Sequence, residues 1–309
     1  MKAIEPQKIK AIVMDLDGTL LNQHNEITPK TEKALIELEK QGVHLLLASG
    51  RSYPRLMEYA RQLKMDEFGG VLLEIDGLAL YDLASGKRVK QKMMEPAELA
   101  DVINFLVRQD VEIQAVYDDG MFVHFSLPML ERKKALRKEL NLPDTYPWTS
   151  GPWNLLSNML NGYATQEYFH SHRGITRPVN KLQLMQDKER IEPVYRALMD
   201  NFGDQYTIYR TTPTQLEILP HGVSKGSALQ RLMKEKGWQK DEVLVFGDGE
   251  NDVSLFEVVD HSFAMKNAAP FIHRQAARIA GDHDEDGIVT ALEENGFQLN
   301  LPEEAQPKK

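Results

Sequence analysis

The sequence contains no cysteine in its 309 residues. This absence excludes a disulfide framework, a thiolate nucleophile and any metal site built on thiolates. The chain also has no run close to the roughly 20 consecutive apolar residues that a membrane-spanning helix needs. Glu5 and Pro6 lie where a signal peptide would be apolar. We therefore expect a cytoplasmic protein with no membrane partner.

Positive charge is also scarce. The 37 Lys and Arg residues against 46 Asp and Glu residues give a formal net charge of −9, and no long basic block occurs. Nucleic-acid-binding surfaces normally show a basic stripe, so nucleic acid is not an expected partner. An acidic protein can still bind an anion where a metal ion and a few basic groups reverse the local charge. Any phosphate chemistry must therefore be concentrated in one site.

Apolar strands and amphipathic helices alternate at both ends of the chain. Strands are expected at residues 11–14, 43–48, 71–75, 243–246 and 263–265. Thr28-Pro29 opens an expected helix that Gly42 closes, and another helix is expected from Lys225 to Lys236. This alternation predicts an α/β fold with a parallel sheet flanked by helices. The alternation is less regular between about Met94 and Asn201, so we expect an inserted second domain there.

Acidic and small residues follow four of the expected strands. The segments are 15–19 (DLDGT), 49–51 (SGR), 76–77 (DG) and 247–252 (GDGEND). Ligands collect at the carboxyl ends of parallel strands, so Asp15, Asp17 and Asp248 are expected to converge on one rim. Closely packed carboxylates repel one another, and a bound cation is the usual remedy. Oxygen-only ligands with room for water and phosphate favour Mg²⁺.

The spacing of Asp15 and Asp17 fits phosphoryl transfer. One carboxylate can attack phosphorus, while the other protonates the departing oxygen and later takes a proton from water. Such a reaction mainly needs in-line positioning and charge neutralisation. The groups expected to supply these to phosphate oxygens are the Thr19 hydroxyl, Ser49, the Gly50 N–H and Lys225 at its helix start.

Each motif taken alone also has a purely structural explanation. The DLDGT segment could be a turn, and SGR could be a strand-to-helix connection. Lys225 could be a solvated helix residue. The ordered set, with every member at a strand end or a helix start, favours the catalytic interpretation.

A second acidic pattern lies near the C-terminus. Residues 282–293 fit the calcium-loop pattern D-x-D-x-D-G-x5-E. Residues 278–281 look like a short strand rather than the incoming helix that such a loop requires. We therefore expect Asp286 to cap a helix over 287–295, and cation binding by 282–293 is left open.

The aromatic and histidine residues of the central region carry no clear chemistry. Trp148 and Trp153 are expected to lie in the core of the inserted domain. His170 and His172 have no carboxylate at ligand spacing, so a solvated loop is the expected reading.

Together the motifs resemble those of the haloacid dehalogenase superfamily, in its Cof-type branch with a type IIB cap. The resemblance is carried by residues 15–21, 49–51, 222–226 and 247–252. It implies a Rossmann-like parallel-sheet core formed by 1–89 and 215–309, with an α/β cap inserted at 90–214. It also implies a Mg²⁺-dependent phosphatase that hydrolyses small phosphate esters, such as sugar phosphates, through an aspartyl-phosphate intermediate.

Carried over residue by residue, the resemblance makes Asp15 the nucleophile and Asp17 the acid/base. Magnesium would be held by Asp15, the main-chain carbonyl of Asp17, and Asp248. The implied phosphate contacts are Leu16, Thr19, Ser49, Gly50, Lys225 and Asn251. Asp252 and Gly249 would support these groups from behind.

One departure from the family pattern is the segment Asp76-Gly77-Leu78, where family members often have Asn-Gly-Ala. An acid at this position is expected to add negative charge near the substrate entrance. The preference for a leaving group is then the property most affected.

Two alternatives stay open. A phosphosugar mutase of the same superfamily would return the phosphoryl group to the sugar instead of to water. A non-catalytic protein would bind a phosphorylated metabolite without turnover. The sequence names neither the substrate, nor the cap residues that select it, nor the oligomeric state.

Overall fold

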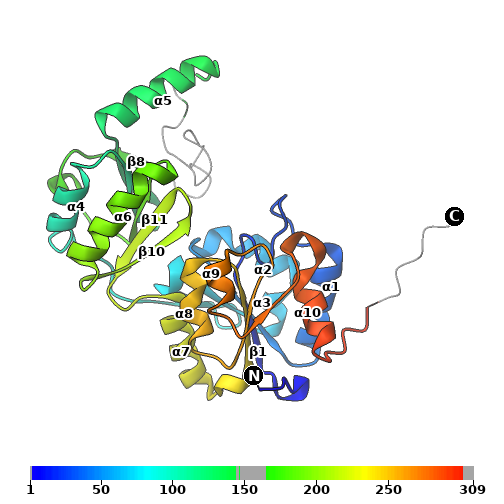
Figure 1. The fold of residues 1–309 in the computed structure, drawn as a ribbon. Helices are drawn as coiled ribbons and strands as arrows, with labels where there is room; N and C mark the ends of the chain where they lie inside the picture. Colours follow the sequence, from blue (N-terminus) through cyan, green and yellow to red (C-terminus); the bar gives the residue numbers. More distant parts are fainter. Residues whose placement is uncertain (1, 144–145, 147–164, 302–309) are drawn as a thin grey trace. The chain divides into compact units, whose positions relative to one another are not determined.

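The chain folds into two compact units in the computed structural model, which describes residues 2–143, 146 and 165–301. One unit consists of Met1–Lys90 and Lys225–Lys309, and the other of Gln91–Ser224. Figure 1 shows the first unit built from both ends of the colour scale and the second from its middle. The expected insertion of one α/β unit into another is therefore the observed organisation.

An eight-stranded sheet, counted over the described residues, forms the centre of the first unit in the order β14-β13-β12-β1-β2-β3-β4-β5. Neighbouring strands are parallel from β14 to β3, and β4 and β5 extend the sheet antiparallel. This confirms the predicted α/β class. The strands are β1 (Ala11–Met14), β2 (His44–Ala48), β3 (Val71–Glu74), β4 (Ala79–Asp82), β5 (Lys87–Lys90), β12 (Val243–Gly247), β13 (His261–Ala264) and β14 (Arg278–Ile279).

Helices cover both faces of this sheet. One buried apolar cluster joins the sheet to α1 and α10, which lie side by side, and another joins it to α7 and α8 (Figure 1). Thr28 starts α1 by accepting a hydrogen bond from the Thr31 N–H, and Pro29 follows at the first helical position. The helices are α1 (Pro29–Lys40), α2 (Met57–Gln62), α3 (Met65–Phe68), α7 (Lys225–Lys236), α8 (Val253–Phe256), α9 (Pro270–His273) and α10 (Gly287–Glu294).

The central strand β1 determines where a ligand can bind. All four of its residues are buried, because it lies between β2 and β12 with helices above and below. The chain runs from β1 to β2 on one side, and β12 pairs on the other side. In open parallel sheets the crevice at such a switch of direction, outside the carboxyl ends of the strands, is the usual ligand position.

The inserted unit has its own sheet and its own core. Its strands follow the order β10-β11-β9-β6-β7-β8, and α4 and α6 pack on one face through a buried apolar cluster. No helix within the described residues combines the length and apolar character needed to cross a membrane. The elements are α4 (Ala100–Leu106), β6 (Glu112–Tyr117), β7 (Gly120–His124), α5 (Leu127–Glu139), β8 (Thr165–Tyr168), β9 (Lys181–Met185), α6 (Lys188–Phe202), β10 (Tyr206–Thr212) and β11 (Gln215–Pro220).

The second boundary between the units differs from the expected one. We expected the core to resume at residue 215, but Gln215–Pro220 forms β11, which pairs with β10 and β9 of the inserted sheet. The core therefore resumes at Lys225. The first boundary shifts from 89 to Lys90 because β5 extends to that residue. The apolar pattern of 215–220 does not show that this strand pairs with β10 and β9, so the boundary was placed too early.

Candidate active site

Four loops at the carboxyl ends of adjacent strands form the candidate active site. They follow β12, β1, β2 and β3, which lie in this order in the sheet. Lys225 joins them as the first residue of α7. Parallel strands end at the same edge, so the sheet brings together loops that are far apart in the sequence.

A buried ion-pair network links three of these segments. Lys225 Nζ donates to Asp15 Oδ1 at 2.6 Å and to Asp252 Oδ1 at 2.7 Å. Burial alone would lower the pKa of Lys225, but the carboxylates of Asp15, Asp252 and Asp76 outweigh it and raise this pKa above its usual value. The ammonium group therefore stays charged and fixes the carboxylate at the end of β1.

Asp252 organises the loop after β12. Its Oδ2 accepts the backbone N–H groups of Asp248 and Gly249, each at 3.0 Å. Residue 247 must be glycine for this packing, because a Cβ there would lie 2.5 Å from the Asp252 Cβ. Asp252 is fully buried and holds the loop in shape from within.

Asp248 faces the loop that follows β1. Its Oδ1 accepts the Thr19 hydroxyl at 2.8 Å. Gly18 has φ +84°, and a Cβ at this position would lie 2.6 Å from Asp248 Oδ2, so both the turn and the close approach require glycine. Burial raises the pKa of Asp248 to about 7, and the nearby charge of Asp252 adds to the effect.

Three carboxylates of this site meet closely enough to share a cation. Asp15, Asp248 and Asp252 present oxygens that lie within 4.8 Å of one another. Burial raises the pKa of Asp15 well above its usual range, although Lys225 opposes the shift. One ammonium group cannot neutralise three carboxylates, and a divalent ion would supply the missing charge.

The donor set fits a hard cation. Asp252 is already bound by Lys225 and by two backbone N–H groups, which leaves Asp15 and Asp248 as the side chains that could ligate a metal ion. Oxygen donors that leave space for water and substrate are the ones that Mg²⁺ takes in phosphate sites.

Asp17 lies apart from these clustered carboxylates. Its side chain is 55% exposed and forms a two-pronged ion pair with Arg51, in which Nε donates to Oδ2 at 3.1 Å and Nη2 donates to Oδ1. The Arg51 guanidinium also lies 5.8 Å from the centre of the Tyr59 ring. Arg51 is not among the site residues that the sequence motifs predict. Its only sequence signal is its place after Ser49 and Gly50 at the end of β2.

The expected phosphate contacts surround this network. The Leu16 carbonyl accepts the N–H groups of residues 19–21, which makes a tight turn directly after β1. Ser49 is buried, and its Oγ accepts the Arg51 N–H at 3.2 Å. Gly50 lies between these two residues at the end of β2. The residues expected to contact phosphate therefore occupy the same edge of the sheet as Asp15.

Asn251 contacts Asp76, the residue expected at the substrate entrance. Its Nδ2 donates to Asp76 Oδ1 at 3.0 Å. The expectation that Asp76 lies at the substrate entrance is wrong, because this side chain is fully buried. The loop after β3 folds inward and carries the carboxylate beneath the site.

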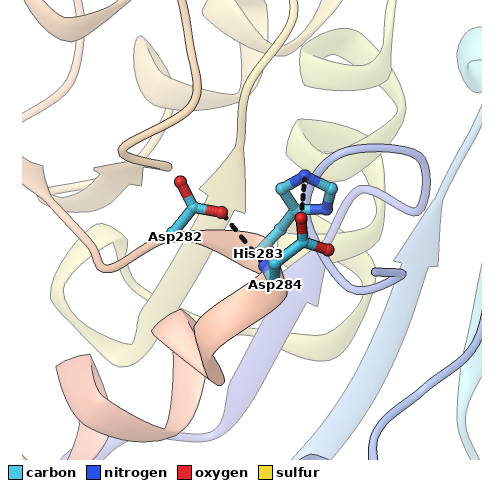
Figure 2. Close-up of side chains that lie close together, drawn as sticks. All are labelled: Asp282, His283 and Asp284. Carbon is cyan, nitrogen blue, oxygen red and sulfur yellow. Dashed lines mark hydrogen bonds and ion pairs between the residues drawn. The ribbon is translucent and has the colours of Figure 1, made fainter. Parts of the chain in front are cut away.

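The acidic residues that fit the calcium-loop pattern contact other parts of the protein. Figure 2 shows Asp282, His283 and Asp284, whose potential ligand atoms lie within 4.8 Å of one another. Asp282 Oδ1 accepts the Asp284 N–H at 3.1 Å, Asp284 Oδ1 accepts the Gln23 N–H at 2.7 Å, and His283 Nδ1 lies 2.7 Å from the Leu21 carbonyl. These contacts tie the loop to the segment that follows the DLDGT turn.

Asp286 does not cap α10 as expected. It stands at the N-cap position, but its side chain makes no capping hydrogen bond there. Instead Oδ1 accepts the hydroxyl groups of Thr28 and Thr31 at the start of α1. The carboxylate therefore joins the beginnings of two adjacent helices.

The remaining candidate residues lie outside the site. His172 Nδ1 lies 2.8 Å from Asn104 Oδ1 within the inserted unit. The His170 ring makes an edge-to-face contact with the His124 ring. Trp148 and Trp153 lie outside the residues that the structure describes.

A protein family and a named relative match most of the chain. Residues 12–292 match the family described as haloacid dehalogenase-like hydrolase. An Escherichia coli protein named 5-amino-6-(5-phospho-D-ribitylamino)uracil phosphatase is 25% identical over 292 residues, which cover 92% of this chain and 95% of that protein.

Solved structures show the same architecture. A haloacid dehalogenase-like hydrolase from Bacteroides thetaiotaomicron is 28% identical and covers 93% of this chain and 99% of its own, with a TM-score of 0.68. A sugar phosphatase of haloacid dehalogenase subclass IIB covers 93% of this chain and 99% of its own with a TM-score of 0.70, at 19% identity. At that identity the second likeness concerns the fold alone.

Proposed function

The chain belongs to the haloacid dehalogenase-like hydrolase family, and from this membership we propose that it hydrolyses small phosphate esters with Mg²⁺ through an aspartyl-phosphate on Asp15. The phosphatase class agrees with the E. coli relative's name. The observation that carries the residue assignment is the Lys225 ion pair. It fixes the Asp15 carboxylate at the end of the central strand, within 4.8 Å of Asp248.

Asp15 is the proposed nucleophile. One of its carboxylate oxygens attacks phosphorus, the bond between phosphorus and the ester oxygen breaks, and Asp17 donates a proton to the leaving oxygen. In the second half, water attacks phosphorus, Asp17 takes a proton from that water, and the bond between phosphorus and Asp15 breaks to release phosphate. A magnesium ion held by Asp15, Asp248 and the Asp17 carbonyl would supply charge neutralisation.

Arg51 controls when Asp17 can act in this scheme. Both oxygens of the Asp17 carboxylate accept hydrogen bonds from the Arg51 guanidinium. The carboxylate must leave Arg51 before it can carry a proton to the leaving group. An incoming phosphate ester is itself an anion and offers Arg51 a competing partner.

The phosphate group is proposed to be held by several donors along the same edge of the sheet. Lys225 is the positive charge nearest to Asp15, and it shares the charge that builds up in transfer. Asp252 and Gly249 keep the β12 loop in place behind these groups. The proposed donors are Thr19, Ser49, Lys225, Asn251 and the backbone N–H groups of Leu16 and Gly50.

A sugar phosphate or a related polyol phosphate is the proposed substrate class. The E. coli relative is named for a ribityl phosphate, and one structural neighbour is named a sugar phosphatase. The inserted α/β unit is proposed to select the leaving group. A cytoplasmic location stays a prediction of the sequence.

Phosphate release under controlled metal conditions tests the proposal. Wild type, Asp15→Asn and Asp260→Asn are compared on an aryl phosphate and a panel of sugar phosphates, after metal removal and after adding back MgCl₂. Asp260 is a matched control because it pairs with Lys2 on the surface of the same unit. We expect Mg²⁺-dependent release by wild type and Asp260→Asn, and none by Asp15→Asn. Equal release by all three proteins would remove Asp15 from its role.

A further inference from the structure

The loop that follows β3 has an unusual backbone. Ile75, Asp76 and Gly77 all have positive φ, at 52°, 52° and 89°. A β-branched residue rarely adopts this conformation, and such strain persists only where surrounding contacts hold it. The Asp76 N–H donates to the Ser49 carbonyl at 2.9 Å, and the Ile75 N–H donates to the Arg51 carbonyl at 3.1 Å. The loop after β2 therefore holds the strained turn.

The side chain of Asp76 reaches in the other direction. It accepts the Asn251 Nδ2–H at 3.0 Å, although β3 and β12 are separated in the sheet by β1 and β2. The Asp76 side chain has no exposed surface. Asp76 thus connects the Ser49 loop, through its backbone, with the Asn251 loop, through its carboxylate.

This contact fixes the orientation of the Asn251 amide, with Nδ2 toward Asp76 and Oδ1 away from it. The Asn251 amide turns its nitrogen toward Asp76, because Nδ2 is the donor to the carboxylate oxygen Oδ1. Gly249 accommodates the other end, because a Cβ at residue 249 would lie 2.6 Å from Asn251 Oδ1. The NH₂ group has a second N–H that Asp76 does not use. A reversed amide would present a carbonyl oxygen, which cannot donate to a phosphate.

We propose that Asp76 is a positioning residue of the phosphate site, which holds the Asn251 amide so that its second N–H can bind a phosphate oxygen. The proposal rests on the proposed phosphatase function for the identity of the ligand. The buried Asp76 carboxylate thus acts through Asn251 and touches no substrate itself.

A double-mutant cycle between Asp76 and Asn251 tests this coupling. The variants are Asp76→Ala, Asn251→Ala and the double variant. Glu74→Gln is the matched control, because Glu74 is a buried acid at the end of β3 that pairs with Arg88. Two quantities are measured in MgCl₂: the kcat and KM for an aryl phosphate, and the Kd of inorganic phosphate by calorimetry. Denaturant unfolding of each variant reports stability separately.

We expect each single alanine variant to weaken phosphate binding and to lower kcat/KM by about tenfold. The double variant should be no worse than either single variant, because both remove the same oriented N–H. Glu74→Gln should lose stability but keep the wild-type Kd. Asp76→Asn keeps an acceptor but allows both amide orientations, so a smaller loss of about threefold is expected.

Additive losses in the double variant would overturn the proposal, as would an equal rise in Kd for Glu74→Gln. Should Asp76→Ala fail to fold, the same cycle is run with Asp76→Asn. The binding arm does not need turnover. A wild type that binds phosphate but hydrolyses nothing would overturn the phosphatase function, while non-additive Kd values would still support the role of Asp76.

Discussion

Lys225 is the single residue on which the charge balance of the site depends. It lies fully buried between Asp15 and Asp252 and pairs with both. Removal of one partner from a buried ion pair leaves the other charge without compensation, which commonly costs about 3–5 kcal/mol. The same residue is therefore expected to contribute to folding and to the proposed phosphate binding, and adding the metal ion separates the two effects.

We expect Lys225→Met to reduce phosphate release by about 100-fold or more and to lower the free energy of unfolding by about 3 kcal/mol. Added MgCl₂ should recover part of the stability, because the ion neutralises the carboxylates that the lysine leaves behind. Lys133→Met is the control, since Lys133 pairs with buried Glu112 in the inserted unit. Its stability should fall without any recovery on addition of MgCl₂. Recovery in both variants, or in neither, would contradict the metal site.

Glu39 is a buried acid that the proposed chemistry does not use. It lies on α1 with 4% exposure, and neither carboxylate oxygen has a hydrogen-bond partner within the described structure. Burial raises the pKa of Glu39 from 4.5 to about 8, and the charges of Asp66 and Glu67 add to the shift. The folded protein therefore keeps a proton here that the unfolded chain releases above pH 4.5.

This difference predicts a stability that falls with pH. Between about pH 4.5 and pH 8 the unfolded state binds fewer protons at Glu39, so the free energy of unfolding decreases as pH rises. Glu39→Gln should show a flatter pH profile in urea unfolding. Glu235→Gln, on the exposed side of α7, should keep the wild-type slope. A Glu39→Gln profile parallel to wild type would show that this carboxyl is not protonated in the folded state.

At the level of secondary-structure elements, local sequence patterns predict strands and helix starts, because these depend on neighbouring residues. The short apolar runs that form β1, β2, β3 and β12 are buried on both faces. The residue that caps the start of α1, Thr28, directly precedes the helix in the sequence. The assignment of β11 to the inserted sheet depends on pairing with β9, whose paired residues lie 30 to 36 positions earlier in the chain. Such pairings have no local signature.

In the site, too, the positions of residues along the chain could be predicted, whereas their contacts with other loops could not. Strand-end positions predict that Asp15 and Asp248 meet at one edge of the sheet, and the start of a helix predicts Lys225 beside them. The partners of Asp17 and Asn251 were not predictable, because Arg51 and Asp76 meet them across neighbouring loops. Which side chains meet there depends on loop conformation and burial.

The acidic loop before α10 gives a prediction for two adjacent elements. Asp286 accepts hydrogen bonds from Thr28 and Thr31, so it joins the starts of α10 and α1. We expect Asp286→Ala to lower the free energy of unfolding by about 1–3 kcal/mol, because two part-buried hydroxyl groups lose their acceptor. Glu285→Ala should change it by less than about 0.5 kcal/mol, since its contact with Lys266 is exposed.

The same unfolding measurement separates a structural loop from a calcium site. CaCl₂ should leave the midpoint of wild type and of Asp286→Ala unchanged, because Asp282, Asp284 and Asp286 already accept protein hydrogen bonds. A midpoint that rises with CaCl₂ in wild type alone would instead support cation binding by this loop.

At the level of the whole molecule, the residues proposed for the chemistry are confined to one of the two units. Every residue assigned to phosphate transfer lies in the unit formed by the two chain ends, and the inserted unit has a separate apolar core. Fold class could be predicted from the alternation of strands and helices, and the family from ordered motifs in one unit. Substrate choice is proposed to lie in the other unit, whose sequence carries no comparable motif.

The fate of the phosphoryl group tests the nucleophile most directly. Wild type and Asp15→Asn are mixed with an aryl phosphate in MgCl₂, quenched with acid during turnover, digested and analysed by mass spectrometry. We predict one added phosphoryl group on the wild-type peptide that contains Asp15, and none on that peptide in Asp15→Asn or in wild type stripped of metal. A phosphoryl group on another residue, or hydrolysis by Asp15→Asn at the wild-type rate, would contradict an aspartyl-phosphate at Asp15.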